Sequence, residues 1–163
     1  NRMRIYASQN APFTLMYDSW KAHSRELVPI SPEESRRKAE VILGKVLSNR
    51  KPPYSIAGGL FDVLEKSNGD MFKVSNDEIV YWVVQYINLE GYDIFPASAC
   101  AVASLKQAID AGIVKGDETV MLNITGGGLF NATKKGYVIK EPDLVLSPDL
   151  PAEEIIMAVD KLF

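Results

Sequence analysis

The stretch Thr119-Val120-Met121-Leu122-Asn123-Ile124, followed at once by Thr125-Gly126-Gly127-Gly128, constrains the fold more than any other part of the sequence. Its first six residues are nearly continuous in apolar side chains, as in a central strand of a parallel sheet that is covered on both faces. The glycines that follow allow the backbone to turn and to approach another group closely. We therefore predict a buried strand over residues 119–124 and a glycine-rich loop at its carboxyl end.

The glycine-rich loop is a candidate ligand site, because ligands of open α/β sheets bind outside the carboxyl ends of the strands. Exposed N–H groups in such a loop can hold an anion. The run matches neither standard phosphate motif, since Asn131 stands where a dinucleotide fingerprint has its third glycine and no Gly-Lys-Ser/Thr follows. A tight turn without a ligand explains the same glycines, so both interpretations stay open.

Helices alternate with short apolar segments along the rest of the chain. A predicted helix over residues 32–48 has Ser31 as its N-cap and carries one apolar stripe. Ser75 and Glu78 form a capping box for a second long helix, which Gly91 ends. The other predictions are helices over 60–66, 97–111 and 151–163, with short strands over 71–74, 92–95 and 144–146. This alternation predicts the α/β class, with helices around a partly parallel sheet.

The predicted helix over residues 97–111 begins with small side chains, so it can pack very closely against a sheet or a ligand. Ser98 and Cys100 are candidate nucleophiles there. However, the sequence has a single histidine, His23, and no Gly-x-Ser-x-Gly turn, so we do not predict a Ser/His or Cys/His pair. Cys100 is more simply interpreted as a small buried residue.

Composition excludes several classes of protein. The 163 residues are 47% hydrophobic and 24% charged, as in one soluble domain. The net charge of −3 argues against a nucleic-acid or anionic-membrane partner. One cysteine and one histidine supply no metal cluster, and no apolar run approaches the roughly 18 to 20 residues of a membrane span. We expect a cytoplasmic protein without a metal site.

The start of the sequence predicts a piece of a longer protein, because the chain opens on Asn1 and runs directly into a strand-like segment. Residues 1–163 are interpreted as a single C-terminal domain, with a possible hinge near residues 50–54. The small residues of the segment Ser55-Ile56-Ala57-Gly58-Gly59 just after that joint line a pocket or simply begin the next helix. The sequence leaves this alternative open as well.

The run Glu90-Gly91-Tyr92-Asp93-Ile94-Phe95-Pro96-Ala97-Ser98-Ala99, then a helix, Gly112 and the segment 122–129, resembles the C-terminal part of threonine synthase. More broadly, it resembles the fold type II pyridoxal-phosphate enzymes. The order and spacing match over residues 75–129, and residues 9–13 are similar to the segment that follows the phosphate-binding region. Within this group, two runs are most similar to the cysteate synthase branch: 51–59 and 123–128.

The resemblance implies roles for individual residues. The hydroxyl of Thr125 is expected to hydrogen-bond the pyridine nitrogen of pyridoxal phosphate, and residues 126–128 (Gly126, Gly127 and Gly128) to pass close to the ring. A neutral hydroxyl does not hold that nitrogen protonated, so the ring is a weaker electron sink and expulsion of a leaving group is favoured. Glu90 and Gly91 would form the wall beside the cofactor. Four residues would face the substrate side of the cleft: Ser55, Ile56, Gly58 and Gly59.

The sequence also departs from the family pattern. Phe95 stands where many relatives have a glutamate before the Pro-Ala-Ser-Ala run. Family members hold the cofactor as a Schiff base on an upstream lysine in a Ser-x-Lys-Asp-like motif, and grip its phosphate with an upstream glycine-rich loop; this chain has neither. Lys106 is interpreted as a solvated helix lysine. The resemblance therefore implies a catalytically inactive C-terminal portion whose partner is the N-terminal half of the enzyme.

The function that the resemblance implies is replacement of the phosphate of a phosphorylated amino acid. In the cysteate synthase branch, O-phosphoserine and sulfite give cysteate and phosphate, on the route to coenzyme M. In the threonine synthase branch, O-phosphohomoserine and water give threonine and phosphate. An alternative of another class is a non-catalytic α/β domain for binding or assembly, because a fold does not establish a function. Association into a homo-oligomer stays open.

Overall fold

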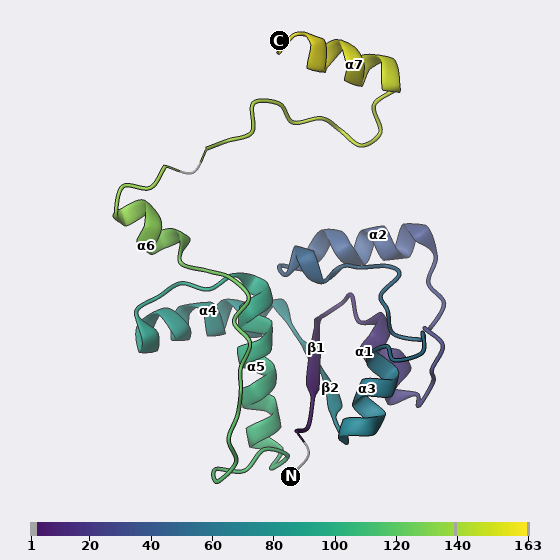
Figure 1. Cartoon of the computed structure of the whole chain (residues 1–163), viewed down its shortest axis with the longest axis vertical. Coiled ribbons are helices and arrows are strands. Elements are labelled where there is room, and N and C mark those ends of the chain that lie inside the picture. Colours follow the sequence, from purple (N-terminus) through teal and green to yellow (C-terminus); the bar gives the residue numbers. More distant parts are fainter. Residues whose placement is uncertain (1–2, 139, 163) are drawn as a thin grey trace. The chain divides into compact units, whose positions relative to one another are not determined.

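The computed structural model describes residues 3–138 and 140–162, and it has the predicted α/β class (Figure 1). The elements in chain order are β1 (Tyr6–Asn10), α1 (Leu15–Lys21), α2 (Pro32–Val41), the 3-10 turn η1 (Lys45–Leu47), α3 (Leu60–Ser67), β2 (Asp70–Val74), α4 (Asn76–Glu90), α5 (Pro96–Asp110), α6 (Leu129–Lys134) and α7 (Ala152–Asp160). The chain divides into two compact units, Asn1–Asn131 and Ala132–Phe163. The hinge near residues 50–54 stays a prediction.

A small parallel sheet lies at the centre of the first unit. β1 and β2 pair in register from Tyr6 opposite Asp70 to Asn10 opposite Val74, and the intervening chain forms the crossover. Successive side chains of a strand point to opposite faces. Met71 packs with the cluster of buried residues that includes Tyr54, whereas Phe72 and Val74 of β2 pack toward α5. The sheet is therefore covered on both faces, by α1 and α3 on one and by α5 on the other (Figure 1).

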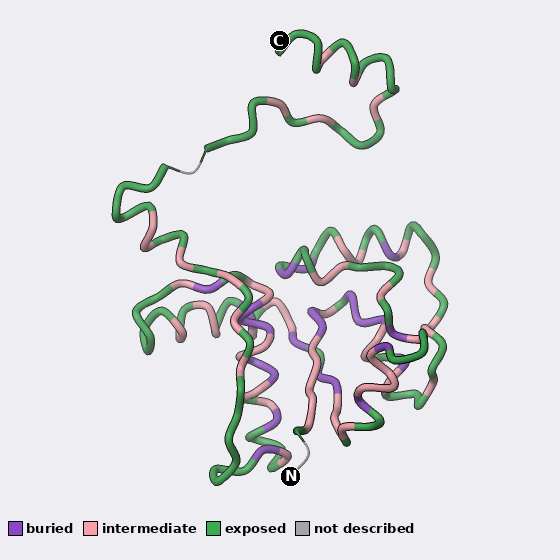
Figure 2. The backbone as a smooth tube through the Cα atoms, viewed as in Figure 1, coloured by how far each residue is buried: buried purple, intermediate pink, exposed green. Residues whose placement is uncertain are grey.

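Buried positions recur along α5 (Figure 2), and all of them carry small side chains, as the sequence predicts. These residues are Ser98, Ala99, Cys100, Ala103, Ser104 and Ala108. Because none of them extends beyond a hydroxyl, methyl or thiol group, the helix lies close to β1, to β2 and to α4. Its middle turns share a hydrophobic core with Val74 and Ile79.

The prediction of one helix over residues 32–48 is wrong, because α2 ends at Val41 and Ile42 is extended. Just after this residue, two amide side chains accept hydrogen bonds from backbone N–H groups. The N–H of Gly44 donates to Asn10 Oδ1 at 2.9 Å, and the N–H of Leu43 donates to Asn76 Oδ1 at 3.1 Å. The predicted apolar stripe is broken as a result: Ile42 is buried, but Val46 is 82% exposed.

The predicted central strand over residues 119–124 is also wrong in this structure. The segment is extended but belongs to no sheet in the described part of the chain, and Met121 is 83% exposed. Leu122 and Ile124 are half-buried while the residues between and after them are exposed. A strand needs a neighbouring backbone to pair with, and the apolar pattern by itself does not supply one.

Predictions from local capping chemistry are confirmed. The Ser75–Glu78 capping box starts α4, and Gly91 ends it in the left-handed conformation with φ 74°.

The expected strand over 92–95 is reduced to a single antiparallel bridge between Ile94 and Gly127. The edge strand expected over 144–146 is absent, since those described residues pair with no other strand.

The second unit contains the last residues of α6 and the helix α7, for which Pro151 is the N-cap residue. α7 spans Ala152–Asp160 rather than the predicted 151–163, and Phe163 lies outside the described residues. In the described parts of the chain, no helix is long and apolar enough to cross a membrane.

We expect Asn10→Ala to destabilise the fold by about 2 to 3 kcal/mol, because a buried donor left unpartnered costs about that much. The Asn10 side chain is fully buried, and its Nδ2 also donates to Val74 O at 3.0 Å. Urea denaturation measures the change. Asn88→Ala, an exposed position on α4, should stay within about 0.5 kcal/mol of the unsubstituted protein. Equal stability of the two variants would contradict the role of Asn10.

Candidate functional site

Two segments that are distant in the sequence, residues 91–98 and 125–131, meet at the start of α5 and form what we call the glycine corner. The N–H of Phe95 donates to Gly126 O at 3.0 Å, and the N–H of Gly128 donates to Asp93 O at 2.8 Å. Between these bonds lies the bridge from Ile94 to Gly127. The predicted triple glycine is therefore fixed by backbone pairing on both sides.

Two of these glycines allow an approach that no other residue permits. A Cβ atom on Gly126 would lie 2.6 Å from the Phe95 ring, and a Cβ on Gly127 would lie 2.3 Å from Asp93 O. A backbone oxygen cannot yield as a flexible side chain can. The Phe95 ring and Asp93 O thus occupy the space that a side chain would need at these two positions, which gives both glycines a structural reason.

Thr125 precedes the glycines and has an exposed side chain. Its Oγ1 lies 3.4 Å from the Oγ of Ser98, which is 1% exposed. Ser98 also donates to Gly126 O at 3.0 Å and accepts from the Gly126 N–H at 3.2 Å. From the sequence, Ser98 is interpreted as a candidate nucleophile and not as a residue that binds the loop. The sequence pattern that could have indicated this role is a serine in the first turn of a helix of small residues, together with a glycine-rich loop. The serine hydroxyl holds the loop by hydrogen bonds.

A carboxylate completes the glycine corner. The Oδ1 of Asp93 accepts from the N–H of Phe130 at 3.1 Å. Slight burial alone raises the pKa of Asp93, but the N–H groups of Phe130, Asn131 and Leu129 outweigh it and hold the pKa below the usual value. Asp93 therefore acts as an ionised cap on the start of α6.

Glu90 and Gly91 lie at the end of α4, next to the glycine corner. Gly91 O accepts from Asn131 Nδ2 at 3.0 Å, which ties the end of α4 to α6, three residues after the last glycine. Glu90 is exposed. The ring of Phe95 covers Gly126 and is 42% exposed. This part of the glycine corner therefore presents an aromatic surface.

The other predicted segment, residues 55–59, lies in a separate turn before α3. The N–H of Gly59 donates to Ile56 O at 2.9 Å, and the N–H of Gly58 donates to Asp62 Oδ2 at 2.7 Å. Arg25 Nη1 donates to Ser55 O at 3.2 Å. Ile56 is 61% exposed. These contacts account for the turn as the start of a helix, and its substrate-side role stays a prediction.

The remaining candidate residues have ordinary surroundings. Burial raises the pKa of Cys100 to about 11, so its thiol is protonated near neutral pH and the residue is the small buried side chain that we predicted. His23 is exposed. Lys106 is an exposed residue of α5 that pairs with Asp110 four residues later. None of these three supplies a nucleophile.

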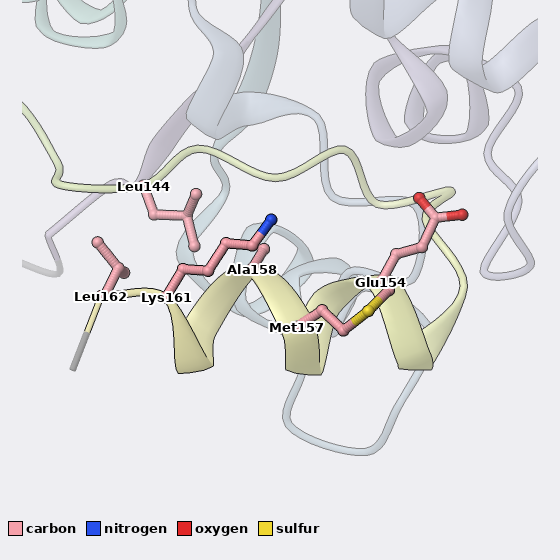
Figure 3. Close-up of a pocket in the computed structure, with 6 residues that line it drawn as sticks. All are labelled: Leu144, Glu154, Met157, Ala158, Lys161 and Leu162. Carbon is pink, nitrogen blue, oxygen red and sulfur yellow. The ribbon is translucent and has the colours of Figure 1, made fainter.

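A surface hollow of about 570 Å³ lies in the second unit (Figure 3). Side chains of α7 and of the two residues after it line it, and Leu144 projects toward them from the segment before α7 (Figure 3). The lining is mostly apolar, with Glu154 and Lys161 as its charged members. No predicted site residue lines this hollow, so the candidate site is the glycine corner.

Comparison with known proteins identifies similar sequences. The family described as pyridoxal-phosphate dependent enzyme matches residues 1–126. The cysteate synthase of Methanosarcina acetivorans is 40% identical over 156 residues, covering 93% of this chain and 37% of that protein. The cysteate synthase of Methanocella paludicola is 41% identical over 159 residues, covering 96% and 37%. The chain therefore spans 37% of the length of these curated relatives.

We expect Gly127→Ala to disrupt the glycine corner, because the added Cβ meets Asp93 O at 2.3 Å. Strain of this kind costs about 1 to 3 kcal/mol, measurable by denaturation. Gly116→Ala is the matched control, since its Cβ would enter open space; it should be neutral or stabilise the protein by up to about 1 kcal/mol. A neutral Gly127→Ala variant would show that the loop is not held as described.

Proposed function

Because this chain belongs to the family of pyridoxal-phosphate dependent enzymes, we propose that it is the C-terminal part of an enzyme that replaces the phosphate of a phosphorylated amino acid. The reaction we propose is that of a cysteate synthase, in which O-phosphoserine and sulfite give cysteate and phosphate. The names of relatives that are 40% and 41% identical support this branch over a threonine synthase.

The observation that carries the proposal is Thr125, an exposed residue whose hydroxyl side chain directly precedes the three glycines. The glycine corner has room for a flat ring at Gly128, where a Cβ atom would meet nothing within 4 Å, and position 125 carries a neutral hydroxyl rather than a carboxylate. Glu90 and Gly91 are proposed as the adjoining wall. Residues 55–59 are proposed for the substrate side of the cleft.

Pyridoxal phosphate, when bound, supplies an electron sink for the amino-acid carbon that loses a proton. We assign to Thr125 the hydrogen bond to the ring nitrogen. A hydroxyl is neutral, so unlike a carboxylate it does not stabilise a proton on that nitrogen. The electron sink is then moderate, which favours departure of phosphate over accumulation of a carbanion. The glycine corner would hold the ring next to this hydroxyl.

The other groups needed for the reaction are proposed to lie in the part of the protein that this chain does not contain. The chain spans 37% of the curated relatives, and it has no Ser-x-Lys-Asp-like run for the cofactor. We propose that an N-terminal half supplies the cofactor-binding lysine and the phosphate-binding loop, and that the full-length enzyme is cytoplasmic. An upstream half without that lysine would argue against an enzyme.

The test of the proposed function is phosphate release by the full-length protein supplied with pyridoxal phosphate. We expect sulfite-dependent release from O-phosphoserine to exceed release from O-phosphohomoserine by at least about tenfold, since a polar site discriminates strongly against a substrate that it does not fit. The reverse preference would replace the cysteate branch with the threonine synthase branch. Release from neither substrate, without the absorption of bound cofactor, would contradict the proposal.

A further inference from the structure

We propose that Ser98 is a positioning residue that makes the Thr125 hydroxyl a hydrogen-bond donor toward the ring nitrogen of the cofactor. The inference rests on the function proposed above, because it concerns the same site. It gives a role to a buried hydroxyl that is neither a nucleophile nor a helix cap.

The contacts of Ser98 all reach the glycine-rich loop. Its Oγ lies 3.0 Å from Gly126 O, 3.2 Å from Gly126 N and 3.4 Å from Thr125 Oγ1. The side chain is 1% exposed, so water is excluded and these loop atoms are its partners. A buried hydroxyl that satisfies its hydrogen bonds in this way fixes the groups around it.

Counting protons shows what Ser98 can do for Thr125. A hydroxyl has one proton to donate and can accept two. Gly126 O also accepts from the N–H of Phe95 at 3.0 Å, so this carbonyl stays paired when the Ser98 proton rotates to Thr125 Oγ1. The Gly126 N–H then donates to Ser98, and Ser98 donates to Thr125. The proton of Thr125 is left free to point away from Ser98.

This chain of donors selects the kind of group that Thr125 recognises. Because Ser98 donates to its oxygen, the Thr125 hydroxyl directs its own proton toward a ligand. An unprotonated ring nitrogen matches it, since this nitrogen can only accept a hydrogen bond. Successive hydrogen bonds polarise one another, which strengthens the outermost donor. Without Ser98, the Thr125 hydroxyl rotates freely and presents a lone pair as readily as its proton.

Ser104 offers a matched control on the same helix. It is 7% exposed, and its hydroxyl donates to Cys100 O within α5 at 2.8 Å. Removing that hydroxyl tests the loss of a buried serine on α5 without touching the loop. A purely structural role for Ser98 predicts the same behaviour at both positions.

The experiment measures the dissociation constant of pyridoxal phosphate and the absorption maximum of the bound cofactor in the full-length protein. Ser98→Ala should raise the dissociation constant about 3- to 10-fold, as expected for one lost neutral hydrogen bond, and shift the absorption maximum. Ser104→Ala should change the constant less than about twofold and leave the spectrum unchanged. Ser98→Cys, a nearly isosteric variant with a weak donor, should behave like Ser98→Ala and serves if the alanine variant does not fold.

The deciding measurement is the double variant. If Ser98 acts through Thr125, Ser98→Ala should not shift the spectrum further in the Thr125→Ala background, so the two effects are not additive. Independent effects, or equal behaviour of Ser98→Ala and Ser104→Ala, would overturn the inference while the proposed function stands. An unsubstituted full-length protein that binds no cofactor would instead overturn the proposed function, and this inference with it.

Discussion

The close approach of α5 to its neighbours is the constraint on which the rest of the first unit depends. Small side chains on one face of this helix let it pack on both strands and on α4, and they let its first turn meet the glycine corner. Ala99 and Ala103 are 0% and 1% exposed in a core shared with Val74 and Ile79. Larger side chains would force these elements apart, because a close-packed interior has no unfilled space for them.

The sequence predicts those parts of the structure that local chemistry decides. The Ser75–Glu78 capping box, Gly91 and the small face of α5 depend on residues within a few turns of one another. The end of α2 does not, since it is set by the amides of Asn10 and Asn76, which are distant in the sequence. The predicted strand over residues 119–124 is wrong for a related reason. The apolar pattern favours a strand, but pairing requires a neighbouring backbone that no local signal provides.

The sequence likewise predicts only part of the candidate site. Its glycines and Thr125 stand out in the sequence, whereas the contacts that make them a site join residues that are 27, 37 and 40 positions apart. Ser98 therefore attracted attention for its nucleophilic group and not for its position behind the loop. The resulting arrangement is a neutral hydroxyl held beside a glycine-rich loop, which suits chemistry in which an organic cofactor is the electron sink.

The state of the cofactor's ring nitrogen tests this account most directly. The measurement is the nitrogen-15 chemical shift of ring-labelled pyridoxal phosphate bound to the full-length protein at neutral pH. The account predicts the shift of an unprotonated, hydrogen-bonded pyridine nitrogen, moving toward the value of a nitrogen without a hydrogen bond when Thr125 is replaced by valine. The shift of a protonated pyridinium nitrogen, or one that is unaffected by the replacement, would contradict it.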